Sequence, residues 1–177
     1  MKTKSAGFTL IETLIVIAVV AILLAIVAPS LQGVLANNQT ATLGDDLFSS
    51  IMMARSEAVR RETIVTLCAA ADNTQSSCAA SASTANWQNG WITFLDPAGT
   101  GTVGASTNIL KLEPTLITNA NINPSASSKI TYQPSGLIST GAGTYTIKVA
   151  GCTGSTGGKQ IVISASGHPT LSAVSCP

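Results

Sequence analysis

An apolar stretch near the start of the chain has the length of a helix that crosses a membrane or a fibre core. The stretch runs from Phe8 to Leu31, about 24 residues, and at a helical rise of about 1.5 Å per residue it reaches across a bilayer core of about 30 Å. A short basic leader with Lys2 and Lys4 precedes it, and Glu12 is the one charged residue inside it.

Helical periodicity continues beyond the apolar stretch. Pro29 removes a backbone donor and its ring crowds the preceding turn, so we expect a kink or local melting there. Gly44 is a second weak point. Further on, apolar residues recur at three- and four-residue spacing and form one stripe of a helix: Leu43, Leu47, Ile51, Ala54 and Ala58. We predict one helix from about Phe8 to about Arg61, whose second half lies across a folded domain.

After Arg61 the pattern changes to short β-prone segments separated by Gly-, Pro- and Ser-rich connections. Residues 69–86 have no periodicity and are expected to form a loop. Strands are expected at 63–68, 91–96, 109–112, 129–132, 144–149 and 160–164. Because no helical segment separates these strands, they predict an antiparallel sheet or sandwich, and the whole chain is predicted to be α+β.

Glu12 places a carboxylate inside the apolar stretch, where an unpaired charge costs several kcal/mol. Cleavage at the Gly7–Phe8 junction would supply a partner, because it creates a free α-amino group at Phe8. Pairing of that amine with Glu12 of a neighbouring subunit would also check the register between subunits. Two alternatives stay open: a secretory signal peptide cut after the stretch, and a Glu12 side chain that reaches the lipid headgroups.

The residues from Lys4 to Glu12, Lys-Ser-Ala-Gly-Phe-Thr-Leu-Ile-Glu, resemble the class III signal of type IV pilins and type II secretion pseudopilins. The resemblance implies cleavage after Gly7 by a prepilin peptidase and N-methylation of Phe8. It also implies that Glu12 neutralises the amine of an adjoining subunit during assembly. The expected organisation is a leader at 1–7, a membrane or filament-core half of the helix at 8–31, an amphipathic half at 32–61 and a β-rich domain at 62–177.

A second resemblance lies in the middle of the chain. The segment from Met53 to Arg61, then Val65 to Cys68, then the Trp87-x-x-Gly-Trp91-x-x-Phe-x-Asp96 segment is similar to the GspH/FimT family of minor pilins and pseudopilins. The family implies a type IV pilin-like fold, in which a long N-terminal helix packs on a C-terminal antiparallel sheet. We expect the two tryptophans to pack in the core against the helix stripe.

Composition describes a nearly neutral chain with few charges. Only 10% of residues are charged, the net charge is +1 and the mean hydropathy is +0.39, so no basic field marks a nucleic-acid binder. The four cysteines form an even set, which indicates two disulfides and an oxidising compartment. Their spacing favours Cys68–Cys78 and Cys152–Cys176, although four cysteines permit three connectivities.

Candidate chemistry for catalysis or metal binding is sparse, and we expect no enzyme activity, metal or cofactor. The single histidine, His168, lies in a turn-like Gly-His-Pro-Thr context and cannot complete a zinc site without further ligands. Asp45 and Asp46 are adjacent on the predicted helix and diverge by about 100°, so they cannot act as a facing carboxylate pair.

DNA binding is the functional alternative that the resemblance raises. Members of the FimT branch that bind DNA resemble one another in a C-terminal Gly-Arg-x-Arg stretch, and this chain has Gly167-His-Pro-Thr170 at the matching place. Both arginines are missing, which weakens the salt-sensitive phosphate contacts that such binding needs. Lys129, Lys148 and Lys159 are scattered through the same domain.

The sequence therefore predicts a minor pilin that primes or caps a type IV pilus. A type II secretion pseudopilin shares every one of these features and stays open, and a DNA-binding minor pilin is disfavoured. The expected partners are other pilins, the prepilin peptidase and, before assembly, the inner membrane. After assembly the protein is expected in the periplasm or in a cell-surface pilus.

Overall fold

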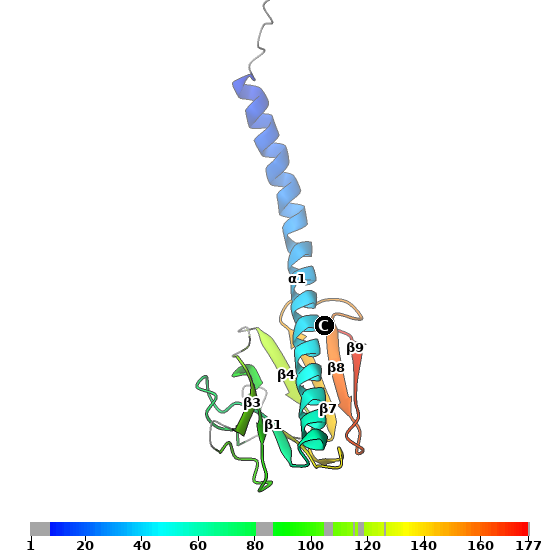
Figure 1. Cartoon of the computed structure of the whole chain (residues 1–177). Coiled ribbons are helices and arrows are strands. Elements are labelled where there is room, and N and C mark those ends of the chain that lie inside the picture. The colour runs from blue at the N-terminus through cyan, green and yellow to red at the C-terminus, as the bar shows by residue number, and fades with distance from the viewer. Residues whose placement is uncertain are drawn as a thin grey trace, which may run out of the picture.

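The structure is a computed structural model that describes residues 8–80, 87–104, 108–114, 116, 119–125 and 127–176, without the side chains of 26–30. A single long helix lies across two antiparallel sheets and projects far beyond them (Figure 1). The predicted α+β class is confirmed.

Helix α1 spans Leu10–Arg60, within two residues of the predicted limits. Thr9 caps its N-terminus, and its side-chain oxygen accepts a hydrogen bond from the Glu12 amide. At the other end, Glu62 adopts a positive φ of 51°, which takes the chain out of the helix. Glu57 forms ion pairs with Arg60 and Arg61 in the last turn, and these hydrogen-bonded guanidinium groups lower the pKa of the Glu57 carboxyl.

In the described part of the chain, nine strands form two sheets in which all pairings are antiparallel. The first sheet has the order β3-β2-β1-β5-β6, with the bounds β1 Val65–Ala69, β2 Trp91–Leu95, β3 Ile109–Glu113, β5 Lys129–Tyr132 and β6 Ile138–Thr140. The second sheet has the order β4-β7-β8-β9, with the bounds β4 Ala120–Pro124, β7 Gly143–Val149, β8 Gly158–Ile163 and β9 Pro169–Val174. Both sheets contact α1.

Three of these strands, β4, β6 and β9, were not predicted. Strand β4 reads Ala-Asn-Ile-Asn-Pro, and Asn and Pro are depleted in strands, although its buried and exposed residues alternate. The turn predicted at Gly167–Thr170 is shorter in the structure and ends at His168. Gly167 adopts a positive φ of 80° in that turn, and β9 begins at Pro169, a first strand position where a missing N–H is tolerated.

The core lies between the second half of α1 and the inner faces of the sheets. The predicted helix stripe is confirmed, because all five of its residues are at most 8% exposed: Leu43, Leu47, Ile51, Ala54 and Ala58. Trp87 and Trp91 are fully buried, as expected, and Trp87 packs edge-to-face against Tyr145 with ring centroids 5.8 Å apart. Burial also raises the pKa of Tyr132 to about 12, while its hydroxyl donates to the Gly167 carbonyl.

Gly44, a weak point for the helix in sequence terms, permits close packing in the structure. A methyl group added at Gly44 would lie 3.0 Å from both Cβ and Cγ of Lys159 on β8. The missing side chain therefore lets the stem of Lys159 lie directly against the helix backbone.

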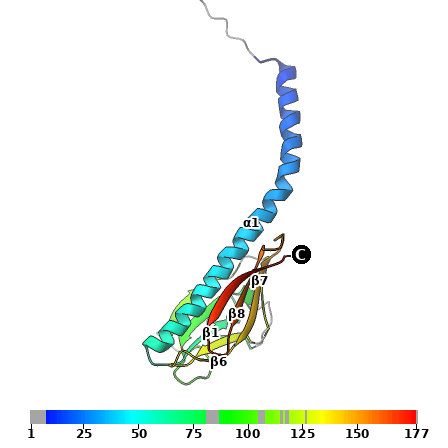
Figure 2. The same ribbon diagram turned by 90° about the vertical axis from the view of Figure 1, so that its right-hand side faces the viewer.

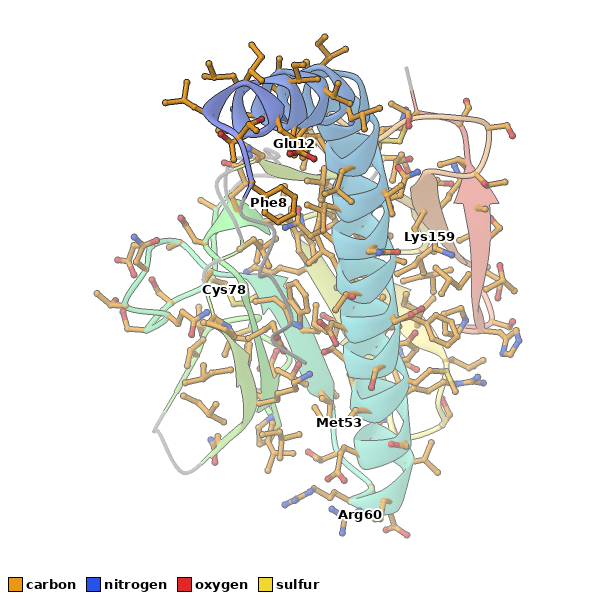
Figure 3. All side chains as sticks on the ribbon, turned by 90° about the horizontal axis from the view of Figure 1, so that it is seen from above. Phe8, Glu12, Met53, Arg60, Cys78 and Lys159 are labelled. Carbon is orange, nitrogen blue, oxygen red and sulfur yellow. A yellow bond between two sulfur atoms is a disulfide. The ribbon has the colours of Figure 1, made fainter. Side chains whose placement is uncertain are left out.

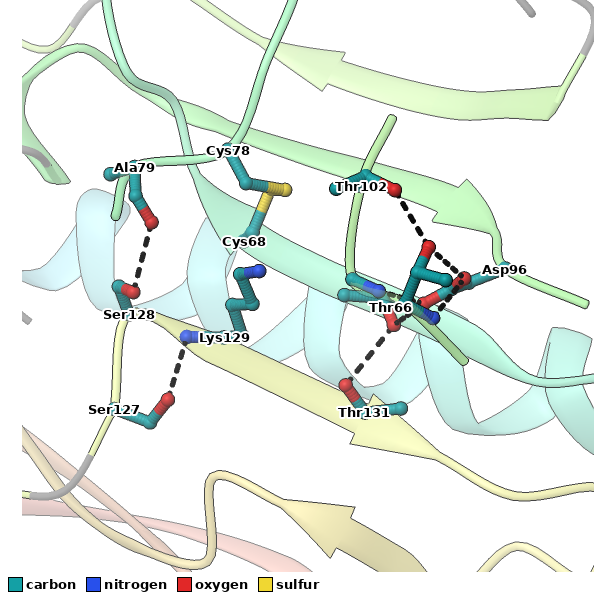
Figure 4. Close-up of a disulfide and its surroundings, with 12 residues drawn as sticks. Thr66, Cys68, Cys78, Ala79, Asp96, Thr102, Ser127, Ser128, Lys129 and Thr131 are labelled. Carbon is teal, nitrogen blue, oxygen red and sulfur yellow. Dashed lines mark hydrogen bonds between the residues drawn. A yellow bond between two sulfur atoms is a disulfide. The ribbon is translucent and has the colours of Figure 1, made fainter. Parts of the chain in front are cut away.

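A second, smaller apolar layer covers the far face of β1 and β2. Cys68, Ile92 and Phe94 are buried there beneath the Cys78 loop and Val103. Asp96 directly follows β2. It is only 3% exposed, and its carboxylate accepts hydrogen bonds from the Thr66 hydroxyl and from the amides of Thr100 and Gly101 (Figure 4).

Two disulfides join the pairs that the cysteine spacing favoured. Cys68 and Cys78 have Cα atoms 5.6 Å apart, and their disulfide closes the loop after β1 (Figure 4). In the same loop, the backbones of Ala70 and Cys78 pair as an isolated antiparallel β-bridge. Cys152 and Cys176 have Cα atoms 5.7 Å apart and connect the loop after β7 to the segment after β9. No free cysteine remains in the chain.

The contact between the helix stripe and the sheets predicts a large difference between two neighbouring helix positions. Ile51→Ala should lower the free energy of unfolding by about 2–5 kcal/mol, because Ile51 is fully buried and truncation leaves a cavity. Met52 is 40% exposed, so Met52→Ala is the matched control and should cost less than about 1 kcal/mol. Urea denaturation followed by fluorescence of the buried tryptophans measures both, and equal losses would contradict the described packing.

Candidate assembly surface

The first half of α1 is an apolar surface that the described part of its own chain leaves uncovered. Along residues 10–24 the large apolar side chains are between 46% and 77% exposed: Leu10, Ile11, Leu14, Ile15, Val16, Ile17, Val19, Val20, Ile22, Leu23 and Leu24. They point in all directions around the helix, and Gly33 is the first buried position of α1 among the residues whose side chains are described. An apolar helix of this kind requires lipid or protein as its surroundings.

The free end of this helix carries the residues that the sequence singled out. Thr9 is the N-cap and Glu12 lies three residues later, the spacing of a capping box. The Thr9 side chain accepts from the Glu12 amide at 3.3 Å. Phe8 is 81% exposed and lies, with Glu12, at the free end of α1 (Figure 3).

The carboxylate of Glu12 has no hydrogen-bond or ion-pair partner among the described residues of its own chain. Its only local stabilisation is the positive end of the helix dipole, worth about 0.3–1 kcal/mol at an exposed site. That is much less than the several kcal/mol needed to bury an ion. A filament or membrane that covered this surface would lower the cost of burying Glu12 by supplying a cation or by leaving the carboxylate in contact with water.

Gly7 and Pro29 are the other two site residues predicted for the N-terminal part of the chain. Gly7 lies outside the described residues, and nothing in the structure tests the cleavage or the methylation at Phe8. Pro29 falls inside α1, whose helical assignment continues through 26–30. The helix axis changes direction between its projecting and packed halves (Figure 2), but the assignment of this bend to Pro29 stays a prediction.

Among the residues whose side chains are described, no helix combines the length and the apolar character required to span a membrane. Residues 26–30 belong to the predicted crossing segment and fall outside that set. Insertion of α1 into the inner membrane thus stays a prediction.

An apolar hollow extends the assembly surface toward the globular domain. It has a volume of about 340 Å³ and is lined mainly by α1, with one residue from the connection between β3 and β4: Leu35, Asn38, Gln39, Thr42, Leu43, Asp46 and Leu116. Leu31, Val34 and Leu35 are each about half-exposed and link the hollow to the projecting helix. The sequence stripe did not reveal this hollow, because Leu116 comes from a distant loop.

The remaining candidates from the sequence do not form a site. Lys129, Lys148 and Lys159 lie on three different strands, and Lys159 packs against Gly44. His168 is within 3.5 Å of an Arg55 guanidinium nitrogen, and Arg55 also donates to the Gly136 carbonyl, a contact that ties α1 to two turns. In the described part of the chain, no group of His, Cys, Asp and Glu residues is arranged to hold a metal.

Two polar helix residues contribute contacts that the sequence reasoning missed. Asn37 binds the backbone of Thr153 in the loop after β7, and Thr40 binds the amide of Val149, the last residue of β7. Their signal in the sequence is weak, because the only hint is a pair of small polar residues three apart, next to the buried stripe.

Comparison with known proteins adds independent information on fold and family. A sequence profile described as "Prokaryotic N-terminal methylation motif" matches residues 2–28, and a profile described as "Type II transport protein GspH" matches residues 43–167. A comparison with curated proteins found no match.

Two solved structures resemble the chain, both crystal structures of the type IV minor pilin FimU of Pseudomonas aeruginosa. One has a TM-score of 0.53 at 18% identity and covers 76% of this chain and 88% of FimU. The other crystal form has a TM-score of 0.50 at 18% identity and covers 74% of this chain and 90% of FimU. The shared architecture is a type IV pilin-like fold. Since the GspH profile covers the packed half of α1 and most of the β-rich domain, the chain belongs to the GspH family.

Proposed function

We propose that the protein is a minor pilin, a structural subunit that enters a type IV pilus through the projecting half of α1 and primes or caps the filament. The observation that carries this proposal is the apolar first half of α1, which the described residues leave uncovered and whose Glu12 carboxylate has no partner among them. A surface of this kind is satisfied when neighbouring subunits bury it, and a solitary soluble protein would leave it in water.

In this proposal a prepilin peptidase removes residues 1–7 and methylates the new N-terminus at Phe8. The match to the N-terminal methylation motif over residues 2–28 supports this step. Before assembly, the apolar stretch holds the subunit in the inner membrane. During assembly, Glu12 meets the α-amino group of an adjoining pilin, and the pair offsets the cost of burying both charges.

A pseudopilin of a type II secretion system is the second candidate, favoured by the description of the family profile as a type II transport protein. Its subunits would use the same helix surface in a different assembly machine. Copurification of the tagged chain with pilins supports the first candidate, whereas copurification with type II secretion components supports the second. DNA binding is not proposed, because no arginines stand in the Gly167–Thr170 turn and the three lysines are dispersed.

Removal of the Glu12 charge should reduce assembly without harming the globular domain. Glu12→Gln keeps the size of the side chain, but it leaves the neighbouring amine unpaired, so we expect incorporation into filaments to fall at least about tenfold. Glu62→Gln removes an exposed acid at the opposite end of the helix and is the matched control. Sheared filaments quantified by immunoblot measure incorporation, and normal entry of Glu12→Gln would contradict the charge-pairing account.

Processing of the leader can be tested separately. Gly7→Arg should block cleavage, because it puts a long charged side chain at the proposed scissile bond, so intact-mass measurement should find residues 1–7 still attached. Ser5→Arg adds the same charge two residues earlier and should still yield a chain that begins at Phe8. A normally processed Gly7→Arg product would show that the cut lies elsewhere.

A further inference from the structure

One loop fastens α1 at the place where the helix leaves the globular domain. We call residues 149–157 the latch loop; they comprise the last residue of β7 and the whole connection to β8. The loop meets α1 at three positions, Gly33, Asn37 and Thr40, which lie on successive turns. These positions stand between the exposed half of the helix and the buried stripe that begins at Leu43.

Asn37 makes the most specific of these contacts. Its Nδ2 atom donates to the Thr153 carbonyl at 3.1 Å, and its Oδ1 atom accepts from the Thr153 amide at 3.0 Å. One side chain therefore satisfies both backbone groups of a single loop residue. This two-point contact fixes the position and the orientation of the loop relative to the helix.

Thr40 adds a buried contact one turn further along α1. Its hydroxyl donates to the Ala36 carbonyl within the helix at 2.8 Å and accepts from the Val149 amide at 3.1 Å. Thr40 is fully buried, so loss of this hydroxyl would leave the Val149 amide without its partner in a dry place.

Two glycines allow the loop and the helix to approach this closely. A methyl group added at Gly33 would lie 2.9 Å from the Thr153 hydroxyl oxygen. A methyl group added at Gly157 would lie 2.6 Å from the Asn37 side-chain oxygen. A side chain at Gly33 would require Thr153 to move, and one at Gly157 would require Thr153 or Asn37 to move.

The Cys152–Cys176 disulfide braces the latch loop from the other side. Cys152 is directly adjacent to Thr153, and both cysteines are at most 9% exposed. Backbone hydrogen bonds from Cys176 to Gly154 and from Cys152 to Val149, each 3.0 Å long, complete the brace. The end of the chain thereby holds the loop in the shape in which Thr153 faces Asn37.

From these contacts we propose that the latch loop is a conformational device, closed by the Cys152–Cys176 disulfide, that fixes where α1 leaves the globular domain. With the disulfide and the contacts of Asn37 and Thr40 in place, α1 stays attached to the globular domain as far as Gly33. The projecting half then leaves the domain at one fixed position. With the disulfide absent, the loop loses its brace, and residues 33–43 of the helix separate from the domain more often. This proposal goes beyond the proposed function, because it concerns how α1 is held on the globular domain before the subunit enters a filament.

Hydrogen–deuterium exchange on the full-length chain in detergent micelles tests the latch. In the double variant Cys152→Ser/Cys176→Ser, exchange of the α1 amides at 33–43 should rise about tenfold, the change that about 1.4 kcal/mol of lost hydrogen bonding produces. The matched control is Cys68→Ser/Cys78→Ser, which removes the disulfide on the far face of the sheet and should leave these amides unchanged.

A second pair of variants keeps the test decisive if loss of a disulfide prevents folding. Asn37→Leu removes the two contacts to Thr153 and should also speed exchange at 33–43, whereas Asn38→Leu changes an exposed amide that does not bond to the loop and should not. Unchanged exchange at 33–43 in Asn37→Leu, or an equal rise in Asn38→Leu, would overturn the latch. Because the measurement uses unassembled protein, its outcome is independent of whether the chain enters a pilus.

Discussion

The structure depends on a helix whose first half is left uncovered by the described part of its own chain. Large aliphatic side chains around all sides of this half of α1 are at least 46% exposed, and the only charge among them, Glu12, has no partner among the described residues. Burial of the aliphatic surface is favourable at about 25 cal/mol per Å², whereas burial of an unpaired carboxylate costs several kcal/mol. In the proposed assembly, the aliphatic surface favours association with any apolar neighbour, and a neighbour that brings a cation to Glu12 is favoured most. This combination is what a subunit of an ordered filament needs.

The globular domain holds the other half of the same helix. A stripe of five small and branched residues packs into the two sheets, the missing side chain at Gly44 brings the helix against β8, and the latch loop ends the packed region near Gly33. Helix α1 therefore has two environments along its length, with polar contacts at the boundary between them. Neither disulfide lies in the projecting half, so both stabilise the domain that carries the helix.

Much of this arrangement follows from the sequence, because periodicity and composition are local signals. The length of α1, its buried stripe, the buried tryptophans and six of the strands were predicted from spacing and residue type. Strands β4 and β9 were not predicted because they contain Asn or Pro, which are depleted in strands, and β6 was not predicted because it is only three residues long. The hollow at Leu116 and the contacts of Asn37 with Thr153 join residues far apart in the chain, so no local pattern could reveal them. Glu12 can be identified from the sequence because a charge inside an apolar run is itself a local signal.

The central claim is that Glu12 pairs with the terminal amine of a neighbouring subunit, and a high-resolution structure of filament tips that contain this protein tests it most directly. The account predicts a Glu12 carboxylate oxygen within about 4 Å of the N-terminal nitrogen of an adjoining subunit, in a contact from which water is excluded. A map in which Glu12 faces only the Thr9 cap of its own helix or open solvent, with the neighbouring amine elsewhere, would contradict it.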